Sequence, residues 1–301
     1  MILKANDVDN TKRIDVFLME KTDYSRTKVQ SLIKDKKVKA NGICVKPSYR
    51  VKENDNIEYE EYQEKEMSAE PMNIPLDIIY EDDDVIVVNK QNGMVVHPAI
   101  GNESGTLVNA LLFHSKNLSD INGEFRPGIV HRIDAYTTGL LVVAKNNKAH
   151  ELLAKQLEDK TTYRKYLALV WGVLPSETGT IDAPIGRDPK DRKKMAVTDK
   201  NARDAVTHFK VIERFKKATL IEVKLETGRT HQIRVHMDYI GYPVVNDPVY
   251  GHRKIIDETG QCLHAYELGF VHPKTNEYMK FTCQAPECFK KIEDMFREDE
   301  I

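Results

Sequence analysis

The chain of 301 residues carries 45 Lys and Arg against 47 Asp and Glu, a formal net charge of −2, and its mean hydropathy is −0.51. At ~150 residues per domain, this length predicts two domains. The sequence has no run of ~18 apolar residues that could span a bilayer, and its first ten residues lack the pattern of a secretory signal. Its four cysteines form no Cys-x-x-Cys pair, which argues against a structural zinc site or a disulfide framework. These properties predict a soluble, cytoplasmic protein.

The near-neutral total conceals two blocks of opposite charge. Residues 12–52 contain 12 basic and 4 acidic residues, a net charge of +8, whereas residues 53–70 contain 8 acidic residues and one lysine, a net charge of −7. Such an asymmetry is typical of a basic binding module joined to another domain by an acidic connector. The glutamate-rich segment 63–75 has no hydrophobic period, so we expect a linker without stable structure. The predicted domains are therefore residues 1–62 and 76–301.

The basic module is predicted to contain two helices, a hairpin and a last strand. Apolar residues recur at helical spacing around Phe17 and again after Ser25, a residue type that caps helix N-termini. Asn41-Gly42 between two short β-like runs is a strong hairpin signal, and residues 56–59 form the last strand. The second helix presents a cationic face that suits phosphate contacts, and a solvated charged face is the alternative. The cations of this face are Arg26, Lys28, Lys34 and Lys36.

This module resembles the small RNA-binding domain named after small-subunit ribosomal protein S-four. The resemblance implies a compact α/β domain that binds structured RNA, with Ser25, Arg26 and Lys28 on the RNA side. The matching features are Arg13-Ile14-Asp15, Phe17-Leu18, Ser25-Arg26, Gln30, Leu32-Ile33, Val38, Asn41-Gly42, Lys46-Pro47, Val51, Asp55 and Ile57.

The larger module, from residue 76 onward, mixes short apolar runs with amphipathic segments. Several predicted strands follow one another without a helix between them, which favours a mixed, largely antiparallel sheet over a doubly wound parallel one. The predicted fold class is therefore α+β. The expected strands cover residues 78–80, 85–89, 140–144, 166–170, 206–212 and 219–225, and the expected helices begin near residues 107 and 148.

The string His131-Arg132-Ile133-Asp134-Ala135-Tyr136-Thr137-Thr138-Gly139 places an acid, a base and a cation in one loop before an apolar strand. A kinase-like catalytic loop is disfavoured, because the acid comes one residue late and the Gly-rich loop and Asp-Phe-Gly motif are missing. A metal site of His97, His131 and Asp134 lacks the usual ligand spacing. The remaining interpretations are a lone catalytic carboxylate steered by arginines and an aspartate that merely caps a turn.

A second dense string, residues 225–236 (LETGRTHQIRVH), follows a predicted strand and ends in a predicted helix. Arg229 falls at the turn between them. An opposite charge within ~4–6 Å stabilises an ionised carboxylate, so we expect Arg229 to pair with Asp134. The alternative is that Arg229 and Arg234 are surface groups that bind phosphate.

Both strings resemble the signature motifs of pseudouridine synthases that act on large-subunit ribosomal RNA, and the D-type synthases are the branch that they match most. The family string HRLDKDTTGL corresponds to residues 131–140, with Ile133 for Leu and Ala135-Tyr136 for Lys-Asp. Gln91 and Asn246 replace the usual Pro and Gly. The resemblance extends over nearly the whole chain. Its other matching strings are Asn89-Lys90, Val96-His97-Pro98, residues 105–112, Arg164-Lys165-Tyr166, Ala168-Leu169-Val170, residues 184–187, Met195-Ala196-Val197, residues 228–236, residues 247–251 and Leu263-His264-Ala265.

The resemblance implies the pseudouridine synthase fold, with a central cleft and flanking helices, and a reaction that needs neither a metal nor an organic cofactor. In that reaction the glycosidic bond of uridine breaks, the uracil turns, and its carbon 5 bonds to the ribose. Asp134 would be the catalytic carboxylate, either as nucleophile or as base. Tyr166 would stack on the uracil, although a core tyrosine is the alternative. Arg229 would pair with Asp134, and Ile233 would form part of the apolar floor of the pocket that binds the base.

The implied substrate is large-subunit ribosomal RNA or its precursor. The enzyme is expected to be a monomer that associates with no membrane and needs no protein partner. The target nucleotide must be flipped out of its stack, at a cost of a few kcal/mol, and Arg132 would fill the vacated space. Further expected RNA contacts are His131, Arg187, Lys193 and Arg234. The rival functions are a non-catalytic RNA-binding protein and a hydrolytic or phosphoryl-transfer enzyme.

Overall fold

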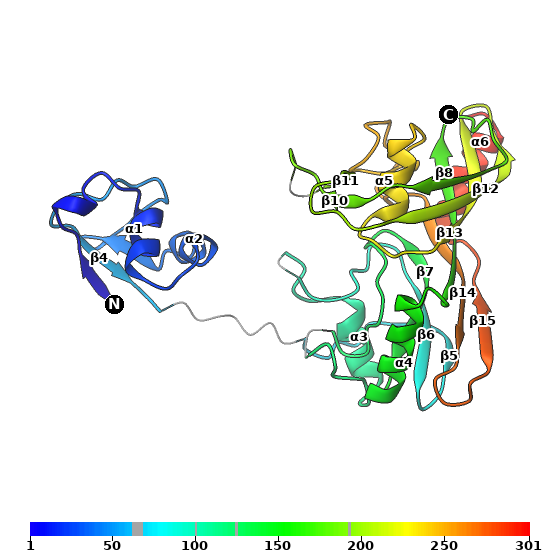
Figure 1. Ribbon diagram of the computed structural model, residues 1–301, viewed down its shortest axis with the longest axis horizontal. Coiled ribbons are helices and arrows are strands. Elements are labelled where there is room, and N and C mark those ends of the chain that lie inside the picture. The colour runs from blue at the N-terminus through cyan, green and yellow to red at the C-terminus, as the bar shows by residue number, and fades with distance from the viewer. Residues whose placement is uncertain (62–68, 100, 124–125, 192–193) are drawn as a thin grey trace. The chain divides into compact units, whose positions relative to one another are not determined.

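The computed structural model describes residues 1–61, 69–99, 101–123, 126–191 and 194–301 of the protein (Figure 1). The chain divides into two compact units, residues 1–66 and residues 67–301. Each unit has a hydrophobic core of its own, which is what a domain needs in order to fold.

The N-terminal unit is a four-stranded antiparallel sheet, in the order β1-β4-β2-β3, with two helices that share its core. The expected helix cap is confirmed, because the Ser25 side chain accepts a hydrogen bond from the backbone N–H of Lys28. Asn41 and Gly42 have φ values of 51° and 80°, the left-handed conformation of a tight hairpin turn. The short strand β1 was not predicted. The elements are β1 (Ile2–Lys4), a 3-10 turn (Asp7–Asp9), α1 (Ile14–Lys21), α2 (Arg26–Lys34), β2 (Val38–Ala40), β3 (Ile43–Cys44) and β4 (Asn56–Tyr59).

Asp15 is fully buried in the N-terminal unit and holds one basic side chain from the start of α1 and one from the start of α2. Its carboxylate accepts two hydrogen bonds from Arg13, at 2.9 and 3.0 Å, one from Arg26 at 3.3 Å and one from Gln30 at 3.4 Å. Burial acts to raise the pKa of Asp15, but these hydrogen bonds lower it below its usual value. The result is a fixed pair of arginines on the surface where RNA contacts were expected.

The second unit is built on a nine-stranded mixed sheet in the order β5-β6-β7-β14-β8-β13-β12-β9, with β15 beside β14. Its strand pairs are antiparallel except for β7 and β14, so the prediction of a largely antiparallel sheet is confirmed. The strands of the sheet are β5 (Asp77–Glu81), β6 (Val85–Lys90), β7 (Thr138–Ala144), β8 (Tyr163–Trp171), β9 (Thr178–Asp182), β12 (Val206–Arg214), β13 (Ala218–Leu225), β14 (Leu263–Val271) and β15 (Tyr278–Thr282), and β10 (Ile185–Arg187) pairs with β11 (Met195–Val197) in a separate hairpin.

The parallel pairing of β7 with β14 brings the backbone of Gly139 against that of Ala265. A Cβ atom on Gly139 would lie 2.2 Å from the Ala265 carbonyl oxygen, and φ at Gly139 is +108°. Both features require glycine. This close approach lies at the start of β7, directly after the loop that carries Asp134. It fixes where the loop ends and the strand begins.

Two helices cover opposite faces of one half of the sheet, and the other two pack on the remaining half (Figure 1). Alternate residues of β6 separate the two faces: Ile86 shares a core with Leu107 of α3, whereas Val87 shares another with Leu153 of α4. Among the described residues, none of the helices is long and apolar enough to cross a membrane. The helices are α3 (Leu107–His114), α4 (Asn147–Glu158), α5 (Gln232–Tyr239) and α6 (Glu287–Arg297).

The segment 69–75 is not the free linker that its composition predicts. The backbone N–H of Met72 donates to the Asn109 carbonyl at 2.9 Å, and the Asn109 side chain donates to the Glu70 carbonyl at 2.7 Å. Apolar side chains of the segment also pack against the core of the second unit, and this anchoring outweighs its acidic composition. The rest of the predicted linker, residues 63–68, lies outside the described residues.

Candidate active site

A cleft of about 600 Å³ opens in the second unit. Its walls come from the loop before β7, from β8, and from the turn that connects β13 to α5. The two strings singled out in the sequence, residues 131–139 and 225–236, therefore meet at one site although about a hundred residues separate them. Asp134, Tyr166 and Arg234 all line this cleft.

The loop that carries Asp134 is held by backbone hydrogen bonds and by a buried lysine. The Thr137 N–H donates to the Asp134 carbonyl at 3.1 Å, and Lys90 donates from Nζ to the Ala135 carbonyl at 2.7 Å and to the Gln91 carbonyl at 2.9 Å. Burial lowers the pKa of Lys90 to about 7, against the opposing charge of Asp134. The motif containing Lys90 was recognised in the sequence, but its contact with this loop was not predicted.

Arg234 is the ion-pair partner of Asp134. Its Nη1 donates to Asp134 Oδ2 at 2.9 Å, while Nε and Nη2 donate to the two carboxylate oxygens of Asp247 at 2.6 and 2.8 Å. The guanidinium carbon also lies 5.0 Å from the centre of the Tyr250 ring. Burial alone would lower the pKa of Arg234, but hydrogen bonds to Asp247 and the charges of both aspartates raise it. The roles of Asp247 and Tyr250 were not predicted.

The expected pairing of Arg229 with Asp134 is wrong. Arg229 donates from Nε to the Asp204 carbonyl at 2.8 Å, and its backbone N–H donates to Gln232 Oε1 at 2.9 Å. The reason is geometric: Arg229 lies in the turn before α5, whereas Arg234 lies in the first turn of the helix, directed at the cleft. Arg229 still lines the cleft. The alternative of Arg234 as a surface phosphate binder is also wrong, because only 4% of Arg234 is exposed.

Tyr166 and Ile233 both line the cleft, and their expected contacts with the uracil stay a prediction. Tyr166 is 5% exposed and belongs to the core as well as to the cleft lining. Burial and the nearby charge of Asp134 raise the pKa of Tyr166, and Arg164 opposes this shift. Ile133, Ile233 and Leu263 are buried apolar residues of the lining that can pack against a planar ring.

His97 and His131, which both line the cleft, make hydrogen bonds within the protein. His131 Nε2 accepts from the backbone N–H of Val142 at 3.1 Å, and His97 Nε2 is 2.9 Å from Arg132 Nη1. Burial, assisted by the charge of Arg164, lowers the pKa of His131 to about 3, so this ring is neutral. Among the described residues, the possible ligand atoms of His97, His131 and Asp134 do not come together as a metal-binding group.

His231 is a third histidine at the cleft, and it adopts a left-handed backbone conformation with φ of 56°. Its Nδ1 is 2.8 Å from the Tyr250 hydroxyl, and its Nε2 is 3.9 Å from Asp134 Oδ1. Burial lowers the pKa of His231, while the charge of Asp134 acts in the opposite direction. Non-glycine residues in this conformation are strained and cluster at functional sites.

The cleft lining carries more positive than negative charge, which suits a polyanionic ligand. Arg132 is exposed at the cleft, and its role in RNA contact stays a prediction. The acids of the lining are Asp134 and Glu158, and the arginines are Arg126, Arg132, Arg164, Arg229 and Arg234.

Ser25, Arg26, Lys28 and Arg187, which are also expected RNA contacts, are not among the residues that line this cleft. Ser25, Arg26 and Lys28 belong to the start of α2 in the N-terminal unit. Arg187 ends β10 and is exposed. Lys193 lies outside the described residues. The role of these positions in RNA binding stays a prediction.

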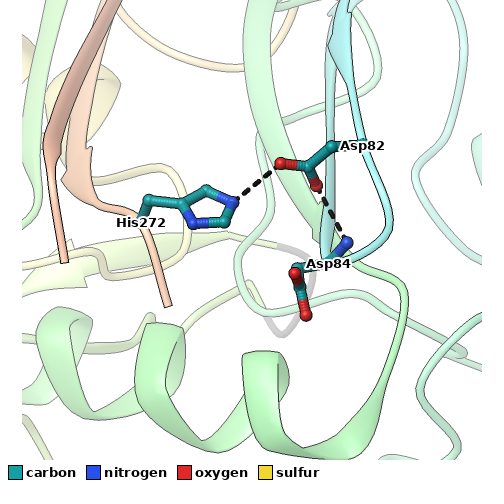
Figure 2. Close-up of side chains that lie close together, drawn as sticks. All are labelled: Asp82, Asp84 and His272. Atoms are coloured by element: carbon teal, nitrogen blue, oxygen red, sulfur yellow. Dashed lines mark hydrogen bonds and ion pairs between the residues drawn. The ribbon is translucent and has the colours of Figure 1, made fainter. Parts of the chain in front are cut away.

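A separate group of metal-ligand residue types joins Asp82 and Asp84, in the turn between β5 and β6, to His272, which follows β14 (Figure 2). His272 Nδ1 accepts from two backbone N–H groups, which leaves Nε2 to carry the proton that it donates to Asp82 at 2.8 Å. Asp82 Oδ1 accepts from the backbone N–H groups of Asp84 and Val85 at 2.8 Å each. These bonds account for the cluster as a turn-stabilising network.

Comparison with known proteins agrees with the geometry of the cleft. A family model described as RNA pseudouridylate synthase matches residues 84–239, and an S4 domain model matches residues 12–57. The chain is 53% identical over 300 residues to the uncharacterized RNA pseudouridine synthase YlyB of Bacillus subtilis, covering 99% of this chain and 98% of that protein. It is 41% identical over 302 residues to the ribosomal large subunit pseudouridine synthase D of Xanthomonas campestris pv. campestris, covering 96% and 90%.

A solved structure supports the same assignment. Human RNA pseudouridylate synthase domain containing 1 superimposes with a TM-score of 0.59 at 27% identity, covering 70% of this chain and 84% of that one. The family resemblance and the predicted fold class are thereby confirmed. The chain belongs to the RNA pseudouridine synthases, isomerases that act on RNA.

Proposed function

We propose that this enzyme converts uridines of large-subunit ribosomal RNA to pseudouridine, with Asp134 as the catalytic carboxylate acting on a flipped-out nucleotide. The observation that carries the proposal is the ion pair of Asp134 with the buried Arg234, 2.9 Å apart, in a cleft that Tyr166 also lines. The other acid of the lining, Glu158, is exposed at the end of α4 and has no such partner among the described residues.

The ion pair prepares Asp134 for either of two reactions. Arg234 Nη1 donates to Asp134 Oδ2 at 2.9 Å and fixes the direction of the carboxylate, and Arg234 is itself held by Asp247. The carboxylate then attacks C1′ of the ribose or removes the proton from C2′. Both routes break the bond between C1′ and N1 of the base. Tyr166 and the apolar side chains of the lining bind the uracil while it turns.

The dimensions of the cleft support base flipping. A cleft of about 600 Å³ admits a nucleoside but not a duplex, so the target nucleotide leaves its stack before reaction. Arg132, exposed at the cleft, is placed to occupy the space that the nucleotide leaves in the RNA.

The choice of substrate rests on the relatives and on charge. Relatives at 41–45% identity are named ribosomal large subunit pseudouridine synthase D. The N-terminal unit adds the basic segment 12–52 and matches the S4 domain, which supplies phosphate contacts with structured RNA. We expect the enzyme to act in the cytoplasm as a monomer.

The test replaces Asp134 by asparagine, which keeps the side-chain shape and removes the charge. Asp134→Asn should abolish pseudouridine formation in large-subunit ribosomal RNA taken from cells that lack this protein, while RNA binding and thermal unfolding stay as in the wild type. Glu158→Gln, the matched change at the other acid of the cleft, should keep activity. Conversion by purified Asp134→Asn would reject the catalytic assignment. Identical pseudouridine maps of this RNA with and without the protein would reject the substrate.

A further inference from the structure

Arg164 is a buried arginine in the cleft to which the proposed function gives no role so far. It lies on β8, two residues before Tyr166, so the alternation of the strand places both side chains on the same face of the sheet. Both are buried residues that line the cleft, and Arg164 is 8% exposed.

Among the residues that the structure describes, no acidic side chain pairs with the guanidinium of Arg164. Within the same part of the chain, its Nε is buried without a hydrogen-bond partner. Arg234, the other buried arginine of the lining, has three hydrogen bonds to two aspartates. A buried charge without a partner is costly, so such a group is expected where a ligand supplies the missing acceptor.

The chain makes room for this guanidinium. A Cβ atom on Gly228, at the start of the turn that leads to α5, would lie 2.8 Å from Arg164 Nη1. The charge of Arg164 also acts on its surroundings. Burial is the main cause that lowers the pKa of His131, and the charge of Arg164 lowers this pKa further. The positive charge of Arg164 therefore acts on the part of the cleft that His131 and Tyr166 line.

The reaction creates a negative charge that the cleft must bind, and this step rests on the function proposed above. When the C1′–N1 bond breaks, its electron pair stays on the base, whether Asp134 bonds to C1′ or takes the C2′ proton. The base is then an anion whose charge is shared by N1, O2 and O4. Carbon 5 next bonds to C1′, either as the Asp134–C1′ bond breaks or as Asp134 returns the proton to C2′. The proton on carbon 5 then leaves and N1 gains a proton, so the product is an isomer of the substrate and Asp134 is again a carboxylate.

We propose that Arg164 donates a hydrogen bond to a carbonyl oxygen of the flipped uracil and stabilises the negative charge that develops on the base as the C1′–N1 bond breaks. Arg234 is already engaged by two aspartates, whereas Arg164 is a buried cation of the lining whose Nε has no partner among the described residues. Donors that are held in place where charge develops are among the largest contributions to catalysis.

The test separates the chemical step from RNA binding. Ribosomal RNA transcribed in vitro is used in single-turnover reactions at saturating enzyme. Arg164→Gln should lower the rate by about 10²- to 10³-fold, the effect of losing one such donor, while the RNA dissociation constant and its salt dependence stay as in the wild type. Arg126→Gln, at an exposed arginine of the same lining, serves for comparison and should weaken RNA binding.

A second substrate tests the charge directly. Transcripts made with 5-fluorouridine carry a base whose anion the fluorine stabilises, so loss of Arg164 should matter less. The ratio of wild-type to Arg164→Gln rates, followed as disappearance of the intact 5-fluorouridine nucleoside, should be smaller than with uridine. Gly228→Ala, which displaces the guanidinium without removing it, should slow the reaction and show the same dependence on fluorine.

Three results would overturn the inference. The first is an Arg164→Gln enzyme with a wild-type saturating rate and weaker, less salt-dependent RNA binding, as expected for a phosphate contact. The second is an equal defect on uridine and 5-fluorouridine transcripts for both Arg164→Gln and Gly228→Ala, as expected for a structural role. The third is a wild-type rate for both variants on both substrates. Failure of the proposed function looks different, because the wild-type enzyme would then form no pseudouridine.

Discussion

Asp247 holds Arg234 by two hydrogen bonds of 2.6 and 2.8 Å, and Arg234 uses its remaining Nη1 to bind Asp134 at 2.9 Å. The carboxylate that we propose as catalytic is thus positioned by a second carboxylate, through an arginine between them. Asp247 also accepts hydrogen bonds from the backbone N–H groups of Val249 and Tyr250. These bonds connect the arrangement to the loop between α5 and β14.

Asp247→Asn should therefore lower the turnover of the enzyme. The amide keeps the shape of the side chain but loses the bidentate ion pair that orients the guanidinium, and a misplacement of about 1 Å at a reacting group costs about 100-fold in rate. We expect such a fall in kcat with RNA affinity retained. Asp238→Asn on α5, a half-buried aspartate near Asp247, is the matched control and should stay active. Equal turnover of the two variants would contradict the positioning role.

The buried Lys90 predicts a pH dependence of stability. Its pKa is about 7 in the folded enzyme and ~10.4 in an unfolded chain, so between these values the unfolded state binds more protons. The contribution of Lys90 to the free energy of unfolding therefore rises with pH across this window, by at most ~1.4 kcal/mol per pH unit, and is constant below it. Urea unfolding at pH 6.5, 7.5 and 9 should show the stability of the wild type rising relative to that of Lys90→Met. Lys148→Met, at an exposed lysine, should show no such trend, and parallel curves for the wild type and Lys90→Met would refute the assignment.

Gly139 predicts a large loss of stability on substitution. Alanine there meets the Ala265 carbonyl at 2.2 Å and must adopt φ of +108°. Gly93, with φ of +76° and no neighbouring atom within 4 Å, isolates the backbone strain alone. Gly93→Ala should cost ~1–2 kcal/mol, and Gly139→Ala should cost more by the ~1–3 kcal/mol of an overpacked site. Chemical denaturation measures both values, and equal losses would mean that the sheet adjusts around Gly139.

The start of α2 predicts a salt-dependent contribution to RNA binding. Replacing Arg26 and Lys28 together by glutamine should weaken binding to structured ribosomal RNA and reduce the slope of log Kd against log salt by ~1 for each phosphate that the variant no longer binds. Deletion of residues 1–62 should have a larger effect of the same kind. Lys274→Gln, at an exposed lysine between β14 and β15, should leave the slope as it was. An unaltered slope after the deletion would show that the N-terminal unit does not bind the RNA backbone.

Local sequence signals were sufficient where a short segment determines its own structure. Ser25 as a helix cap, the Asn41-Gly42 turn and the helix and strand around residues 140–157 follow from neighbouring residues, and each is present in the structure. The central strand β14 was not predicted, because its position beside β7 and β8 depends on residues far away in the chain. The anchoring of residues 69–75 was missed for the same reason, since it depends on contacts with Asn109.

The sequence by itself determined the class of the protein, the basic segment expected to bind RNA, and the two strings whose side chains form the cleft. It did not determine which arginine meets Asp134. Arg229 and Arg234 are five residues apart, and their roles are decided by where α5 begins and by which face of it the sheet covers. The sequence also did not predict the state of Arg164. The position of a charged residue in a predicted strand does not reveal whether the side chain is buried or whether it has an ion-pair partner. Both are properties of packing between distant segments, and only the tertiary structure sets them.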